Sequence, residues 1–117
     1  MQEGIKMENK VERYDDKIVV EPVANRIDVT NAQEFKDFLV SLIGQGEREL
    51  ILDLHQVEFM DSTALGVIVS IFKRLKEAGG EDLKLCGLSE LVKELFEITR
   101  LHKVMKLFPS REEALAG

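Results

Sequence analysis

The fold is decided by the stretch Met60-Asp61-Ser62-Thr63-Ala64-Leu65-Gly66, which joins a predicted strand to a predicted helix. Before it lies the almost wholly apolar segment Leu50-Ile51-Leu52-Asp53-Leu54, which is typical of a strand buried on both faces of a sheet. After it, over about 63–78, apolar residues recur at helical spacing. This order of a buried strand, a short polar junction and a helix indicates an α/β domain.

The same alternation extends to both sides of this stretch. Strands are predicted over 11–14 (at an edge), 17–23, 49–54, 83–86 and 104–108, a loop over 25–29, and helices over 63–78 and after Thr30, Ser89 and Ser110. Thr30 with Gln33, and Ser110 with Glu113, match the capping-box pattern of a helix start. The order β-β-α-β-α-β-α-β-α predicts one domain over 10–117, with a mixed, mostly parallel sheet of about five strands and helices packed against it. Residues 1–9 are expected to be a flexible lead-in.

Composition limits the partners and the compartment of the chain. Its 117 residues carry a net charge of −6, which disfavours binding to nucleic acid or to an anionic membrane surface. No apolar run approaches the ~20 residues of a membrane span, and the polar first ten residues do not form a signal peptide. The single cysteine, Cys86, lies in an apolar run and is expected in the core. We therefore expect a cytoplasmic protein.

Catalytic motifs are missing from the sequence. His55, His102 and Cys86 lack the spacing of zinc ligands. Ser62 has Met60 and Ala64 as neighbours where the nucleophile elbow of a hydrolase has glycines. We expect neither an enzyme nor a metal or other cofactor.

Asp53 is a separate candidate, because an acid at the end of a buried strand can accept a phosphoryl group. A receiver domain would need an acidic pair at the end of its first strand to hold Mg²⁺, and here that end reads Val20-Glu21-Pro22-Val23. Asp53 is therefore expected to accept hydrogen bonds in a turn.

Local chemistry leaves two interpretations of Ser62. Asp61, Ser62 and Thr63 are ordinary residues for a helix start, where side-chain oxygens accept the free backbone N–H groups. The same end of a helix carries partial positive charge and favours an added phosphate. Both readings stay open on the residues alone.

Two further features favour a docking surface beside Ser62. Met60 and the first half of the helix (Ala64, Leu65, Val67, Ile68) are apolar nearly all round, which predicts an exposed apolar patch. Gly66 lies one turn beyond Ser62, where glycine costs a helix roughly 1 kcal/mol relative to alanine. Close approach of a partner would explain that cost.

The segment from Phe59 to Val67 resembles the signature of the STAS-domain anti-sigma factor antagonists. The resemblance extends from about Lys17 over most of the chain, and includes Leu50–Leu54, the segment Lys76-Glu77-Ala78-Gly79-Gly80 and the segment Leu91-Val92-Lys93-Glu94-Leu95-Phe96. It implies a STAS fold and a regulatory binding protein. Members of this family bind an anti-sigma factor that is also a serine/threonine kinase, and so free a sigma factor.

The resemblance also implies roles for individual residues. Ser62, directly after the aspartate, would be phosphorylated by the kinase, which breaks the complex, and a PP2C-like phosphatase would restore it. The implied partner surface comprises Asp28, Met60, Asp61, Ser62, Thr63, Ala64, Gly66 and Val67.

The chain departs from the family pattern at two positions. Asn25 stands where the family has a glycine before Asp28, and Ala64 stands where it usually has another. Asn25 is expected to serve because asparagine tolerates left-handed backbone. Two other functions are retained as alternatives: a STAS subunit of a transporter or a signalling scaffold, and a receiver-like phosphoacceptor using Asp53.

Overall fold

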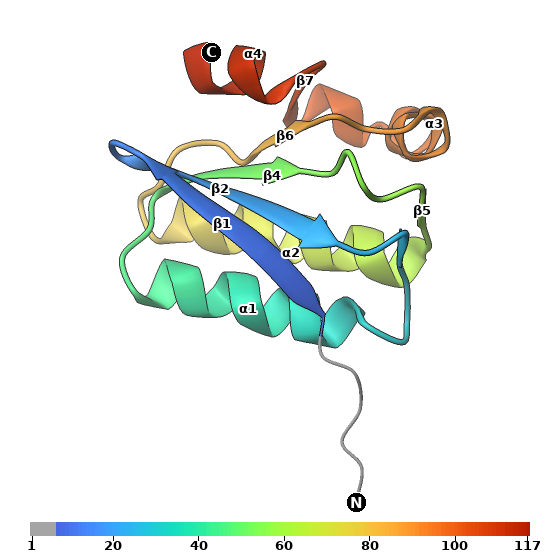
Figure 1. Ribbon diagram of the computed structural model, residues 1–117, viewed down its shortest axis with the longest axis horizontal. Helices are drawn as coiled ribbons and strands as arrows, with labels where there is room; N and C mark the ends of the chain where they lie inside the picture. Colours follow the sequence, from blue (N-terminus) through green and yellow to red (C-terminus); the bar gives the residue numbers. More distant parts are fainter. Residues whose placement is uncertain (1–6) are drawn as a thin grey trace, which may run out of the picture.

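The computed structural model describes residues 7–117 as a five-stranded sheet with helices on both faces (Figure 1). The strands of this sheet are β1 (Glu8–Tyr14), β2 (Lys17–Val23), β4 (Glu49–Asp53), β6 (Lys84–Cys86) and β7 (Lys106–Phe108). The helices are α1 (Ala32–Gly44), α2 (Ser62–Glu77), α3 (Glu90–Ile98), the 3₁₀ turn η1 (Leu101–Lys103) and α4 (Arg111–Ala116). The strands lie in the order β1-β2-β4-β6-β7, with β1 antiparallel to β2 and the other pairs parallel. The predicted fold class is confirmed.

Two layers of core follow from the side-chain alternation of the central strands. Leu50 and Leu52 of β4 pack in the larger core with α1 and α2, which lie together on one face of the sheet (Figure 1). Ile51 points to the other face and packs with Cys86 and Ala114 of α4. β4 is apolar at nearly every position because both of its faces are covered. Cys86 is a buried core residue, as predicted, and burial with the nearby Asp53 charge raises its thiol pKa to about 12.

The predicted helix starts are confirmed at two of three positions. Ser89 Oγ accepts a hydrogen bond from the backbone N–H of Val92 (3.1 Å) and Ser110 Oγ accepts one from Glu113 (3.2 Å). The capping box at Thr30 is wrong, because α1 begins one residue later, after Asn31, and the Thr30 hydroxyl donates to Asp28 instead.

A second, two-stranded sheet was not predicted. β3 (Arg26–Ile27) lies parallel to β5 (Phe59–Met60), in the segment 25–29 that we expected to be a loop. The carbonyl of Asn25 accepts hydrogen bonds from the N–H groups of Glu58 (2.7 Å) and Phe59 (3.2 Å), which fixes the start of this pairing. The small sheet holds the β2–α1 connection against the residues that precede α2.

Some boundaries differ from the prediction. Glu8 and Asn9 belong to β1 and not to the lead-in, whose first six residues lie outside the described part of the chain. β7 begins at Lys106, two residues later than predicted, because the N–H groups of Val104 and Met105 bond back to the carbonyl of Leu101. Within residues 7–117, no helix has both the length and the apolar character needed to cross a bilayer.

Candidate functional site at the start of α2

Asp61 organises the start of α2 with both of its carboxylate oxygens. Oδ1 accepts a hydrogen bond from the backbone N–H of Ala64 (3.0 Å), which caps the helix. Oδ2 accepts one from the backbone N–H of Val29 (3.1 Å), in the connection between β3 and α1. A single side chain therefore fixes the helix start and ties a neighbouring loop to it.

Ser62 and Thr63 are the first two residues of α2, and both are exposed. The first N–H groups of a helix have no partner within the helix, so those of Ser62 and Thr63 point out of its end together with the positive end of the helix dipole. Gly66, one turn further on, is also exposed, and a Cβ built there would meet no described atom within 4 Å beyond its chain neighbours and the adjacent backbone of its own helix. The fold itself therefore does not require glycine at this position.

The predicted apolar patch on α2 is wrong. Met60, Ala64 and Val67 are between 0 and 7% exposed, as buried as the rest of the core. The first half of α2 is apolar nearly all round because it packs against α1, against β5 and against the larger core of the sheet. These three side chains support the site from beneath and are almost fully buried.

Other apolar side chains are exposed beside Ser62. Val29 is 72% exposed in the loop that Asp61 holds, and Phe59 is 39% exposed in β5. The guanidinium of Arg26 lies over the Phe59 ring, 4.8 Å from its centre, and fixes that ring's position. The sequence carried a signal for both residues, since each is apolar in a segment without a periodic apolar pattern.

Asp28 is used to build the loop that carries Val29. Its Oδ1 accepts hydrogen bonds from the hydroxyl (2.6 Å) and the N–H (3.0 Å) of Thr30, and its Oδ2 accepts one from Arg26 (2.9 Å). Its own N–H donates to the side chain of Asn31 (2.9 Å). The bonds from Thr30, and then the one from Arg26, lower the pKa of Asp28. Asp28 shapes the candidate surface by holding its loop.

The two departures from the family pattern have structural explanations. Asn25 does not adopt the left-handed backbone that we expected: among the described residues other than glycine, only Asp15 and Arg100 have positive φ. The Ala64 side chain is fully buried, so its methyl group fills core space and does not reach the surface around Ser62. Ala64 therefore does not change what the site presents to solvent, whereas Asn25 is exposed.

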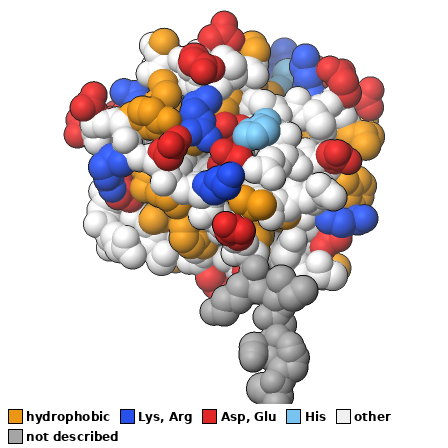
Figure 2. Space-filling model, in the orientation of Figure 1, with side chains coloured by type: hydrophobic (Ala, Val, Ile, Leu, Met, Phe, Trp, Pro, Cys, Tyr) orange, Lys and Arg blue, Asp and Glu red, His pale blue; other side chains and the backbone are white. Residues whose placement is uncertain are grey.

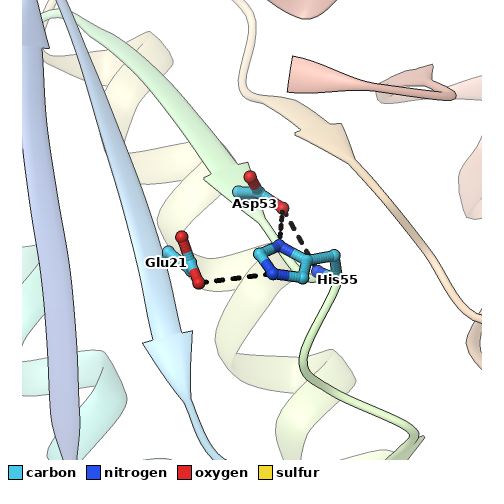
Figure 3. A group of neighbouring side chains, drawn as sticks. All are labelled: Glu21, Asp53 and His55. Atoms are coloured by element: carbon cyan, nitrogen blue, oxygen red, sulfur yellow. Dashed lines mark hydrogen bonds and ion pairs between the residues drawn. The ribbon is translucent and has the colours of Figure 1, made fainter.

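A second polar cluster lies at the carboxyl ends of β2 and β4 and was not predicted. Figure 3 shows Glu21 and Asp53 on neighbouring strands, with the ring of His55 between them. Both carboxylates are buried, and Arg111 of α4 donates to each of them, to Asp53 Oδ2 at 2.9 Å and to Glu21 Oε1 at 2.8 Å. His55 Nδ1 lies 2.9 Å from Asp53 Oδ1 and its Nε2 lies 3.5 Å from Glu21 Oε2.

This cluster attaches the start of α4 to the sheet through Arg111. Burial raises the pKa of Asp53, but hydrogen bonds from His55 and Arg111 outweigh burial and leave that pKa below its usual value. Asp53 Oδ1 also accepts the N–H of His55 (3.2 Å), which confirms the predicted turn role. Gly87 (φ +71°) is needed here, because a side chain on it would come within 3.0 Å of His55.

The same contacts argue against other chemistry at the cluster. Glu21, Asp53 and His55 offer oxygen and nitrogen atoms within 4.8 Å of one another, as a metal site would. Arg111 already forms an ion pair with each carboxylate, however, and the two ring nitrogens of His55 face different acids. A phosphoryl donor would also have to displace Arg111 to reach Asp53, which disfavours the receiver-like alternative.

The chain matches a known domain family over most of its length. The model of the STAS domain matches residues 9–114. The chain belongs to the STAS domain family. Its match to the anti-sigma-B factor antagonist of Bacillus subtilis is 42% identical over 90 residues, which cover 77% of this chain and 81% of that protein.

Solved structures of other proteins share the fold of this STAS domain. The crystal structure of tm1081 from Thermotoga maritima, assigned as an anti-sigma factor antagonist, superposes with a TM-score of 0.85 at 29% identity and covers 92% of both chains. The phosphorylated form of the Bacillus cell fate determinant SpoIIAA superposes with a TM-score of 0.71, over 93% of this chain and 97% of that one. At 20% identity, the second likeness shows a shared fold.

Proposed function

We propose that this STAS domain is an anti-sigma factor antagonist, a binding protein and not an enzyme, switched by phosphorylation of Ser62. The unphosphorylated form binds an anti-sigma factor that is also a serine/threonine kinase and frees a sigma factor. Phosphorylation breaks the complex, and a PP2C-like phosphatase restores it. The observation that carries this proposal is the exposed Ser62 hydroxyl at the start of α2, beside the exposed side chains of Val29 and Phe59.

The start of α2 tolerates a phosphate on Ser62. The group adds about −1.5 to −2 charges at neutral pH. The free N–H groups of Ser62 and Thr63 and the positive end of the helix dipole favour that charge, while the adjacent carboxylate of Asp61 opposes it. We therefore expect the fold to be retained after modification.

A partner that covers this surface does not tolerate the same phosphate. Contact with Val29, Phe59 and Gly66 removes water from the region around Ser62, and a doubly charged group without a partner there carries a large desolvation penalty. Val29, Phe59, Ser62, Thr63 and Gly66 are the contact residues in this proposal. Asp28 and Asp61 position the surface.

Mass spectrometry after incubation with ATP and the anti-sigma kinase of the same bacterium tests the modification. We expect one phosphate, on the peptide that contains Ser62, and none on the Ser62→Ala variant. Thr63→Ala is the matched control for the site of modification and should still carry its phosphate on Ser62. A phosphate on Thr63 or elsewhere would contradict the assignment of Ser62.

Binding of Ser62 variants to the same kinase tests the switch. Ser62→Asp should bind at least roughly tenfold more weakly than the wild type, because a charge is left without a partner in the interface. Asparagine has nearly the same shape as aspartate but no charge, so the Ser62→Asn variant should keep most of the affinity for the kinase. Equal losses in the two variants would contradict a charge mechanism and would indicate steric exclusion.

A further inference from the structure

Among residues 7–117, no strand pairs with the outer edge of β1. Within residues 7–117, β1 is hydrogen-bonded on one side only, to β2, and it forms one margin of the sheet (Figure 1). Six of its seven residues are exposed. Such an edge presents a row of unpaired backbone groups that another strand can use.

β1 lacks the usual structural protection of an edge strand. It is as long as β2, its register with β2 runs without a bulge from Glu8 to Tyr14, and it contains neither proline nor glycine. Its remaining protection is the charge of its side chains. Figure 2 shows that acidic and basic side chains are interspersed on the face of the molecule that β1 crosses.

The charges of β1 are complementary to those of a second copy of the same strand. In an antiparallel pair related by a two-fold axis, all seven residues are paired only when Val11 faces its own copy. That register places Lys10 opposite Glu12 of the other copy, and does so twice by symmetry. Opposite charges that face each other across strands are stabilising. Val11, 41% exposed, then covers its counterpart on the axis.

Neighbouring registers are less favourable. A pair centred on Lys10 places two lysines opposite each other and Glu8 opposite Glu12, and a pair centred on Glu12 places two glutamates together. Like charges directly opposite each other are destabilising. The sequence of β1 therefore favours the register in which all seven of its residues are paired.

The charged face is also held in place within one chain. Arg111 donates to Glu12 and to the hydroxyl of Tyr14 (3.3 Å), so these two side chains lie on the α4 side of the sheet. Lys10 lies on the same side as Glu12 because alternate residues of a strand share a face. Lys10 can therefore meet the second copy's Glu12 on one side of a continuous sheet.

We propose that two copies of this chain pair through β1, antiparallel and centred on Val11, to form a ten-stranded sheet. The pairing uses the sheet edge and not Ser62, so the assembly would present two Ser62 sites. It does not depend on the proposed function, and its test involves no kinase.

Sedimentation equilibrium over a wide concentration range tests the pairing. The wild type should be in monomer–dimer equilibrium. Lys10→Glu should dimerise roughly tenfold more weakly or worse, since two attractive pairs become repulsive. Lys73→Glu, the same change at an exposed position of α2, should dimerise as the wild type does. A wild type that stays monomeric, or a Lys10→Glu variant that dimerises normally, would overturn the proposal.

Mixing two variants tests the register without relying on loss of association alone. Lys10→Glu and Glu12→Lys should each fail to pair with themselves, because each places like charges opposite each other. Their equimolar mixture should form a heterodimer, in which both pairs between positions 10 and 12 are again of opposite sign. Circular dichroism of each variant checks folding. Two folded variants that do not associate when mixed would contradict the register centred on Val11.

Discussion

Asp61 and Asp53 use the same bonding pattern for different purposes. Each follows or ends a strand, and each divides its two carboxylate oxygens between its own segment and a distant one: Asp61 between α2 and Val29, Asp53 between the turn at His55 and Arg111. Asp61 does this at a surface with exposed hydroxyl groups. Asp53 is 5% exposed and ion-paired.

The difference shows that surroundings decide which acid marks a functional site. Around Asp53, every strong polar group is paired within the chain, so the cluster stabilises the attachment of α4. Around Asp61, no hydrogen bond from the described part of the chain reaches the Ser62 hydroxyl or the first two N–H groups of α2, and the side chain of Val29 is exposed. The candidate partner site is recognised here by exposed groups that do not contribute to the stability of the fold.

Arg111→Ala tests the Asp53 side of this comparison and has the largest expected effect. It leaves Glu21 and Asp53 buried without a counter-charge, which should lower the free energy of unfolding by about 3 kcal/mol. Urea denaturation followed by circular dichroism measures the loss. Arg74→Ala, on the exposed face of α2, is the control and should stay within about 0.5 kcal/mol of the wild type. Equally small losses of unfolding free energy in both variants would show that the cluster does not stabilise the attachment of α4.

Asp61→Ala tests the other side, with a smaller effect. Loss of the helix cap should lower the free energy of unfolding by about 1–2 kcal/mol. Hydrogen exchange of the Val29 N–H should also become faster, because its acceptor is removed. Asp61→Asn keeps an oxygen for the cap and should lose less stability. Unchanged exchange at Val29 in the alanine variant would contradict the tie between α2 and the loop.

Gly66→Ala separates the needs of the fold from those of the partner. Because no atom lies near a side chain at this position, alanine should raise the free energy of unfolding by up to ~1 kcal/mol. Affinity for the anti-sigma kinase should fall, because the methyl group occupies the proposed interface. Ser70→Ala, one turn further along α2, is the control for binding. A variant that is more stable and binds normally would remove Gly66 from the contact residues.

Low pH should remove the stabilising contribution of Asp53 while Arg111 is left in place. Hydrogen bonds from His55 and Arg111 keep the pKa of Asp53 lowered in the folded chain despite its burial, so its stabilising contribution is complete at neutral pH. That contribution is lost as the pH falls below about 4, where aspartate in the unfolded chain is protonated. Urea denaturation of the wild type and Asp53→Asn should therefore show a stability difference that shrinks in acid. A difference that persists at low pH would indicate a steric cause.

Local pattern was sufficient for much of the fold. The apolar run of β4 predicted a strand covered on both faces, and residue types at Ser89 and Ser110 predicted two helix starts that the structure confirms. The types at 61–63 predicted a third helix start without showing which of them is the cap, and the structure shows that it is Asp61. Ser62 as a phosphorylation site came from the family resemblance and stays a prediction. These features depend on neighbours in the sequence, which is why the sequence displays them.

The features that were missed depend on residues far apart in the chain. Two-residue strands such as β3 and β5 have no periodicity to detect. Arg111 reaches Asp53 across 58 positions, and nothing near either residue indicates the other. The apolar first half of α2 was interpreted as an exposed patch because the sequence does not show that α1, β5 and the sheet cover it together. The pairing of Glu21 with Asp53 did have a signal, since both stand at the carboxyl ends of neighbouring parallel strands.

The short turn between β1 and β2 bears on how quickly the parts of the chain assemble. Tyr14 pairs with Lys17 across this turn, whereas Ile18 of β2 must find Leu50 of β4 after α1 has been placed. Hairpins of this kind form in roughly 1–10 μs, while parallel pairs wait for their helical crossovers. We therefore expect the β1–β2 hairpin to form transiently before the rest of the sheet. The docking of β4 should then set the folding rate.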